Sequence, residues 1–181
     1  MERLRASIDE YGASLIGEIG LDKYWNYGTE EEQQELFERQ LDLASELGLP
    51  VIIHNRDADR QTIEILEKRT FPKGGIIHCF SADEDFMERA IKLGFMISFA
   101  GNVTYKSNRK IQECAKKCPI DRILYETDSP YLSLVPMRGK PNRPEYTDYT
   151  SEFIAGLREM DTDEFRARCI GNFRRFLKID C

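Results

Sequence analysis

The sequence lacks several features that mark large functional classes. It contains only two histidines and one tryptophan in 181 residues. No apolar run approaches the roughly 20 residues that a membrane span needs. The opening residues Met-Glu-Arg-Leu-Arg-Ala are not followed by an apolar signal segment either. We therefore expect a cytoplasmic protein that makes no use of a membrane.

Positive charge is also scarce. The 26 Lys and Arg are outnumbered by 32 Asp and Glu, which gives a net charge of −6. A chain this acidic does not hold nucleic acid through bulk charge, so any action on phosphate needs a metal ion or a local basic cluster. The cations placed beyond predicted strand ends are Arg56, Arg60, Arg138, Lys140 and Arg143. They predict either a local basic rim or ordinary solvated surface charge.

The cysteines do not form a disulfide framework. There are five of them, at positions Cys79, Cys114, Cys118, Cys169 and Cys181. An odd number without a secretory signal is typical of reduced thiols in a cytoplasmic protein.

Short apolar runs alternate with longer amphipathic stretches along the chain. With 41% hydrophobic and 32% charged residues, the chain can bury a core. We predict strands over 14–18, 50–54, 74–78, 95–99 and 122–126. Helices are predicted over 4–11, 29–47, 58–68, 83–93, 108–117, 147–159 and 162–177. Repeated strand–helix units indicate an α/β domain with a parallel sheet, here over residues 1–181 as a single domain.

The residues that carry chemistry follow the predicted strands. Glu18, His54, His78 and Asp128 each come after an apolar run, and both histidines of the chain are among them. The carboxyl ends of parallel strands meet on one face, where active sites lie. A mixed set of imidazoles and carboxylates suits a divalent ion such as Zn²⁺, Mn²⁺ or Mg²⁺. The alternative for each residue alone is a hydrogen-bonding role that holds a loop in place.

Aromatic residues follow the Glu18 strand. Trp25 and Tyr27 predict either a surface on which a nucleobase stacks or simple packing of the loop.

Four motifs carry a resemblance to a known family. They are GEIGLD at 17–22, PVIIHNRD at 50–57, IIHCF at 76–80 and YETDSPYL at 125–132. At these residues the sequence resembles the TatD-type metal-dependent deoxyribonucleases, which are amidohydrolase-like TIM barrels. The resemblance implies hydrolysis of phosphodiester bonds, with DNA as the substrate. It also implies divalent cofactors, with Mg²⁺ as the first expectation for catalysis and Zn²⁺ or Mn²⁺ as alternatives.

The resemblance also implies roles for the four residues. Glu18 would be shared between two metal ions, and His54 and His78 would complete one metal site. Asp128 would belong to the other metal site and act on the attacking water. Glu18 and Asp128 are therefore the expected catalytic residues, and all four are expected metal ligands.

The sequence departs from the family at its start. Such proteins normally begin with a strand that bears a His-x-His pair, and no histidine precedes Glu18 here. Five predicted strands fall short of the eight in a TIM barrel. We therefore expect an incomplete barrel, truncated at its N-terminal side, with activity weakened by the loss of the first metal ligands. Open sheet edges would favour self-association. The alternatives are a non-catalytic or single-metal remnant that serves as an interaction module, and a hydrolase of small esters or amides.

Overall fold

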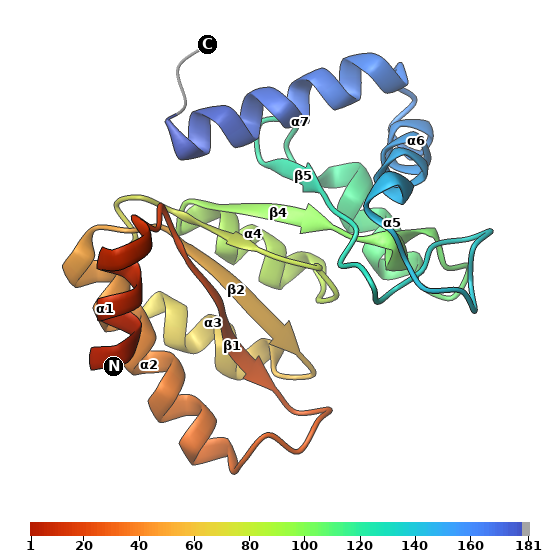
Figure 1. Cartoon of the computed structure of the whole chain (residues 1–181). Helices are drawn as coiled ribbons and strands as arrows, with labels where there is room; N and C mark the ends of the chain where they lie inside the picture. Colours follow the sequence, from red (N-terminus) through yellow and green to blue (C-terminus); the bar gives the residue numbers. More distant parts are fainter. Residues whose placement is uncertain (179–181) are drawn as a thin grey trace.

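A computed structural model describes residues 1–178, and it contains one parallel sheet of five strands (Figure 1). The strands are β1 (Ile16–Asp22), β2 (Val51–Arg56), β3 (Gly75–Ile77), β4 (Phe95–Phe99) and β5 (Ile123–Tyr125). They are hydrogen-bonded in the order β1-β2-β3-β4-β5, and every neighbouring pair is parallel. Each strand thus lies beside the next one in sequence, as in an α/β barrel. The predicted α/β fold is confirmed.

Helices connect these strands and follow the last of them. They are α1 (Glu2–Tyr11), α2 (Glu30–Leu47), α3 (Asp59–Glu67), α4 (Glu84–Lys92), α5 (Arg109–Lys117), α6 (Thr147–Leu157) and α7 (Thr162–Leu177). Two short 3₁₀ helices, Gly101–Thr104 and Pro144–Tyr146, lie in loops. The predicted limits of α2 are explained by its caps. The Thr29 hydroxyl accepts the Glu32 N–H in a capping box, and Gly48 closes the other end with a left-handed backbone.

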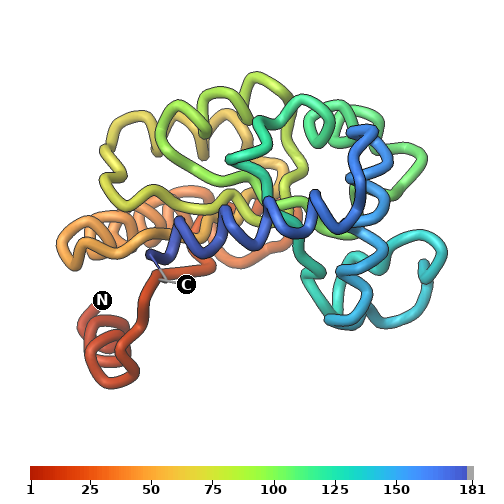
Figure 2. The backbone as a smooth tube through the Cα atoms, turned by 90° about the horizontal axis from the view of Figure 1, so that it is seen from above, coloured from red at the N-terminus to blue at the C-terminus, as the bar shows by residue number. Residues whose placement is uncertain are grey.

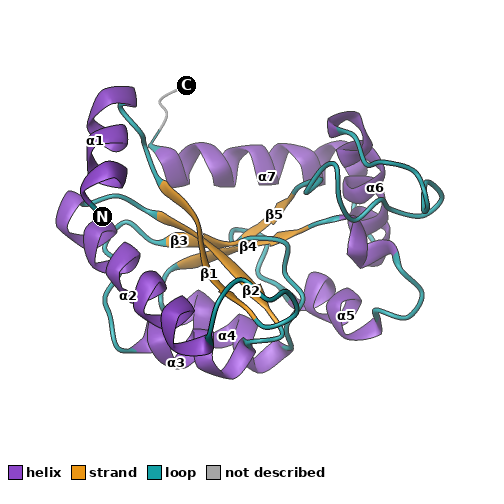
Figure 3. Ribbon diagram, turned by 60° about the horizontal axis from the view of Figure 1, so that its bottom comes forward, coloured by secondary structure: helices purple, strands orange, loops and turns teal. Residues whose placement is uncertain are grey.

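Both faces of the sheet are covered, which explains why its strands lack polar alternation. In Figure 3, α2, α3, α4 and α5 lie on one side of the sheet and α7 runs along the other. Alternate residues of β2 face these two sides, because successive side chains of a strand point in opposite directions. Ile53 belongs to the large core beneath the helices. Ile52 packs on the opposite, concave face with Ile76, Met96 and Leu124, and Phe176 of α7 covers this cluster.

The sheet is open within the part of the chain that the structure describes. β1 pairs with β2 alone and β5 with β4 alone, so each is an edge strand. Helix α1 lies at the periphery beside the start of β1 (Figure 2), where Arg5 forms an ion pair with Glu46 of α2. The expectation of an incomplete barrel with five strands is therefore confirmed. No helix between residues 1 and 178 combines the length and apolar character of a membrane span. Cys181 lies outside the described residues.

The prediction that Glu18 ends its strand is wrong. β1 continues to Asp22, and Gly20 and Asp22 lie opposite His54 and Arg56 of β2. The pairing register shifts between Ile16 and Ile19, so Glu18 lies at an irregularity inside the strand. Gly20 resembles a strand breaker in the sequence, but the strand requires it. A Cβ at this position would overlap the carbonyl oxygen of His54.

Candidate metal centre

The structure brings three of the predicted site residues into one group. The Nδ1 atom of His54 lies 3.3 Å from Nε2 of His78. The Oε2 atom of Glu18 lies 3.3 Å from Nε2 of His78 and 4.0 Å from Nδ1 of His54. One ligand atom from each residue falls within 4.8 Å of the others. These three residues therefore form a group that can hold a metal ion.

Strand alternation explains why the two imidazoles meet. His54 follows Ile52 by two positions on β2, and His78 follows Ile76 by two positions at the end of β3. Ile52 and Ile76 are paired in register on the concave face, so both histidines project on that same side. The backbone N–H of His78 donates to the carbonyl of Ile53, which extends the pairing to the level of the site. The predicted convergence of the two histidines is thus what the structure has.

Each imidazole has a carboxylate at its other nitrogen. The Oδ2 atom of Asp22 lies 3.1 Å from Nε2 of His54, and Oε1 of Glu126 lies 3.5 Å from Nδ1 of His78. A carboxylate at the outer nitrogen stabilises an N–H there and leaves a lone pair on the inner nitrogen. Two lone pairs and the Glu18 carboxylate then face one another, an arrangement that calls for a positive charge between them. The donor set therefore fits a divalent cation.

Asp22 is fixed by the loop that follows it. Its Oδ1 atom accepts the backbone N–H groups of Tyr24 and Trp25, both at 2.9 Å. Burial acts to raise the pKa of Asp22, but the Trp25 N–H, His54 and the Tyr24 N–H together outweigh it and hold this pKa below its usual value. Asp22 therefore stays ionised and keeps the imidazole of His54 in one orientation.

Glu126 orients the imidazole of His78 as Asp22 orients that of His54. Its carboxylate accepts the backbone N–H of Cys79 as well as lying beside His78. Burial would lower the pKa of His78, but the carboxylates of Glu126, Glu18 and Asp128 raise it overall. The centre therefore carries an excess of negative charge that attracts either protons or a cation.

Asp128 lies beside this group without being one of its three members. Its Oδ2 atom is 3.7 Å from Sγ of Cys79, the residue after His78. Burial raises the pKa of Asp128; His78 opposes this rise, and Glu126 and Glu18 add to it. Cys79 and Asp128 both have left-handed backbones, with φ of 47° and 56°. Such a conformation costs about 1–2 kcal/mol in a non-glycine residue and is concentrated at functional sites.

The sequence interpretation did not single out Asp22 and Glu126. Glu126 is the last residue of the predicted strand 122–126, so its position at a strand end was a usable signal for it. Asp22 was missed because the strand was predicted to end at Glu18. Its contact with His54 depends on β1 continuing alongside β2.

Two arginines of the predicted basic rim form ion pairs. Arg60 pairs with Glu64 at 2.8 Å, and Arg143 pairs with Glu145 at 3.6 Å. Two other arginines lie over aromatic rings instead. The guanidinium carbon of Arg56 is 4.1 Å from the ring centre of Tyr24, and that of Arg138 is 4.0 Å from the ring centre of Tyr105.

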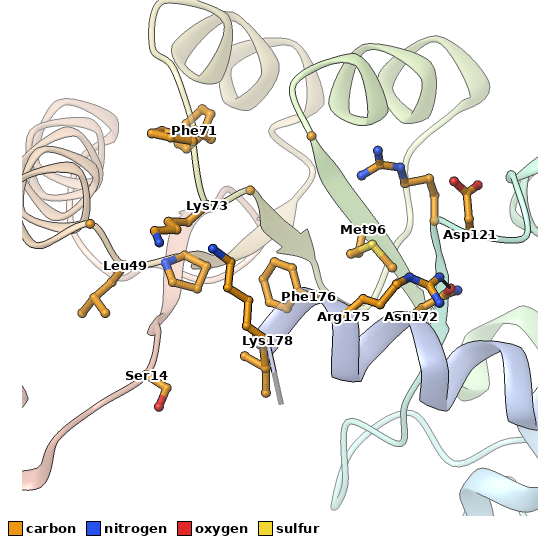
Figure 4. A pocket seen from close by; sticks show the side chains of 17 residues that line it. Ser14, Leu49, Phe71, Lys73, Met96, Asp121, Asn172, Arg175, Phe176 and Lys178 are labelled. Carbon is orange, nitrogen blue, oxygen red and sulfur yellow. Dashed lines mark hydrogen bonds between the residues drawn. The ribbon is translucent and has the colours of Figure 1, made fainter. Parts of the chain in front are cut away.

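A pocket of about 810 Å³ lies at the other end of the sheet (Figure 4). Residues that directly precede strands line it, including Pro50, Gly74, Gly94 and Arg122, so it opens at the amino ends of the strands. Figure 4 shows Phe176 of α7 and Lys178, which directly follows α7, among the side chains that line this pocket. Active sites of α/β barrels lie at the carboxyl ends, where Glu18, His54 and His78 meet. We therefore assign the chemistry to the metal-ligand group and not to this pocket.

Comparisons with known proteins agree with this geometry. The profile of the family described as TatD related DNase matches residues 1–178. The chain is 42% identical to the uncharacterized metal-dependent hydrolase YabD of Bacillus subtilis over 166 residues, which cover 91% of this chain and 65% of YabD. It is 40% identical to the uncharacterized metal-dependent hydrolase YcfH of Escherichia coli K12, over 99% of this chain and 68% of YcfH.

A solved structure extends the comparison to the fold. The crystal structure of YjjV, a TatD homologue from Escherichia coli K12, superimposes with a TM-score of 0.92 at 31% identity. The match covers 99% of this chain and 70% of YjjV. The chain thus spans about two thirds of the length of the relatives it matches. Since the family profile matches nearly the whole chain and the metal-ligand group lies at the expected end of its sheet, the chain belongs to the TatD related DNase family of metal-dependent hydrolases.

Proposed function

We propose that this chain hydrolyses phosphodiester bonds in DNA with a divalent metal ion. The observation that carries the proposal is the group of Glu18, His54 and His78, in which each imidazole is oriented by a second carboxylate. The family description names a DNase, and the two curated relatives are named metal-dependent hydrolases. Metal-dependent hydrolysis of phosphodiester bonds in DNA is the reaction that satisfies both the name DNase and the name metal-dependent hydrolase.

The residues of the site have three roles: binding the ion, orienting its ligands and accepting a proton. Glu18, His54 and His78 would hold the ion, while Asp22 and Glu126 keep the imidazoles in place. A bound divalent ion would lower the pKa of a water molecule and offset negative charge at the phosphoryl centre. We assign Asp128 to the site as a further ligand and as the acceptor of a proton from the attacking water, since it lies next to Cys79 and His78.

The choice of ion follows from the ligand atoms. Two of the three grouped ligands are nitrogens, which suits Zn²⁺ and Mn²⁺, and the carboxylates of Glu18 and Asp128 supply oxygens for Mg²⁺. Mg²⁺ is the first ion to test in catalysis, with Zn²⁺ and Mn²⁺ beside it.

Labelled single- and double-stranded DNA provide the test. The purified chain is incubated with each ion, and the same reactions are repeated with EDTA. We expect hydrolysis that EDTA abolishes, that His78→Ala removes, and that the control Arg60→Ala leaves intact. Arg60 is a solvent-exposed helix residue paired with Glu64, away from the metal-ligand group.

Other outcomes assign the chain to the competing functions. If DNA stays intact with all three ions although one metal equivalent binds, the chain acts as a non-catalytic module. If small esters or amides are cleaved and DNA is not, the substrate class is wrong while the metal chemistry stands.

A further inference from the structure

We infer that Tyr24, Trp25 and Arg56 form a binding subsite for an unpaired nucleotide beside the metal centre, an inference that rests on the proposed function. The two aromatic residues follow β1, and Arg56 is the last residue of β2. We call these three residues the aromatic–arginine platform. The subsite would take a nucleobase on its exposed ring surface and a phosphate on its guanidinium.

The platform is assembled through contacts between its own members. The Tyr24 and Trp25 rings meet edge to face, with ring centres 4.8 Å apart and planes at 85°. The guanidinium carbon of Arg56 is 4.1 Å from the ring centre of Tyr24 and 5.9 Å from that of Trp25. Tyr24 nevertheless remains 58% exposed and Trp25 52% exposed. Large aromatic surface is thus held in place and left open to a ligand.

Arg56 has no carboxylate partner among residues 1–178, although the chain carries a net charge of −6. Arg60, four residues later, is instead neutralised by Glu64 at 2.8 Å. A guanidinium stacked on a ring keeps its in-plane N–H donors available, and those donors match the oxygens of a phosphate. Arg56 is therefore an anion-binding group that the protein itself does not satisfy.

The platform is joined to the metal centre through two routes. Arg56 follows His54 by two residues on the same face of β2, a separation of about 6.6 Å along the strand at about 3.3 Å per residue. The backbone N–H groups of Tyr24 and Trp25 both donate to Asp22, the carboxylate that orients His54. A polynucleotide with one phosphate at the metal centre would therefore place a neighbouring nucleotide near the platform.

The chemistry of the platform favours an unpaired nucleotide over a duplex. Bases in a duplex are stacked on both faces, while a free base offers its face to an aromatic side chain. Each such contact strengthens binding without requiring a particular sequence. We therefore assign single-stranded DNA, or an unpaired end, as the occupant of this subsite.

The platform contains the only tryptophan of the chain, which gives a direct readout. Trp25 emission is titrated with a 12-residue oligothymidylate in EDTA, so that binding is measured without hydrolysis. We expect saturable quenching with the single strand and little quenching with a blunt duplex of equal length. Equal quenching by the duplex, or none by the single strand, would overturn the inference.

Substitutions then separate stacking from charge, with binding followed by the anisotropy of a labelled oligothymidylate. We expect Trp25→Ala to weaken binding about tenfold, while its backbone N–H to Asp22 is retained. Arg56→Ala should weaken binding and reduce the slope of log Kd against log salt by about 0.7, the value for one phosphate contact on a single strand. Tyr11→Ala and Arg60→Ala are the matched controls, since Tyr11 is an exposed aromatic residue of α1 and Arg60 is paired with Glu64.

The two ideas can fail separately. If the single strand quenches Trp25 but no metal supports hydrolysis, the subsite stands and the proposed function fails. If DNA is hydrolysed but Trp25→Ala and Arg56→Ala bind like their controls, the platform is only loop packing and the inference fails.

Discussion

The Nδ1 atom of His54, within β2, and the Nε2 atom of His78, directly after β3, lie 3.3 Å apart although the residues are 24 apart in sequence. Asp22 and Glu126 lie at the opposite nitrogens, so the inner nitrogens are left to face each other and Glu18. Bringing these groups together costs free energy unless a proton or a cation lies among them. The stability of the fold should therefore depend on what this centre holds.

We expect divalent metal to raise the melting temperature. An ion that binds only the folded state at 100 times its Kd contributes about 2.7 kcal/mol. For a chain of this size that corresponds to a rise of roughly 5–10 °C. Calorimetric scans with Zn²⁺ or Mn²⁺ and with EDTA measure the difference. In His78→Ala the rise should vanish, and a rise that persists in this variant would place the ion elsewhere.

Asp22→Asn should weaken metal binding and spare the fold. The amide keeps an oxygen for the N–H groups of Tyr24 and Trp25 but loses the charge that stabilises the outer N–H of His54. Loss of such a supporting carboxylate typically lowers metal affinity 10- to 100-fold. Titration calorimetry measures the change. Asp57→Asn, an exposed carboxylate with no contact to either imidazole, is the control, and equal affinities for the two variants would refute the role of Asp22.

The buried thiols should resist modification in the folded protein. Burial raises the pKa of Cys114 to about 11 and those of Cys118 and Cys169 to about 12. At pH 8 roughly one part in a thousand or less of each is the reactive thiolate. Burial and the nearby Asp128 also raise the pKa of Cys79 well above its usual value.

A thiol titration with Ellman's reagent at pH 8 checks this expectation. The Cys181→Ser variant is used, so that the four described cysteines are counted alone. They should react slowly before urea is added and rapidly afterwards. Rapid reaction of three or more thiols in the native protein would show that the core is not packed as described.

Open sheet edges predict self-association of the isolated chain. β1 and β5 each leave one side of the strand without a partner strand among residues 1–178. Unpaired backbone groups on such edges favour pairing with another copy. Sedimentation velocity over a hundredfold range of protein concentration should show a rise in average mass. A monomer over the whole range, with one cooperative melting transition, would contradict this prediction.

The fold could be predicted because local signals and the global topology agree. α2 began and ended where Thr29 and Gly48 indicated, and α7 spans the predicted residues 162–177. The extent of β1 could not be predicted in the same way. A glycine such as Gly20 usually indicates the end of a strand. Here β1 requires it, because the backbone of His54 on the neighbouring strand approaches it closely. Local patterns carry no information about such a contact.

The candidate site also contains residues that the sequence predicts and residues that only contacts between strands reveal. Glu18, His54, His78 and Asp128 were predicted to meet because the carboxyl ends of parallel strands share one face. The structure groups the first three and places Asp128 beside Cys79. Asp22 and Glu126 act through hydrogen bonds and charge across strands, so no spacing in the sequence revealed their partners. Arg56 was predicted only as one of several cations beyond strand ends, which form either a local basic rim or ordinary surface charge. Its position over Tyr24 depends on the pairing of β1 with β2.

The central claim is that Glu18, His54 and His78 bind a divalent ion through the inner nitrogens of the two imidazoles. Anomalous diffraction at the zinc absorption edge, from a crystal grown with Zn²⁺, tests it most directly. The account predicts an anomalous peak about 2.0–2.2 Å from Nδ1 of His54, Nε2 of His78 and an oxygen of Glu18. Anomalous peaks that lie only elsewhere in the crystal, or a peak on the outer nitrogens beside Asp22 and Glu126, would contradict it.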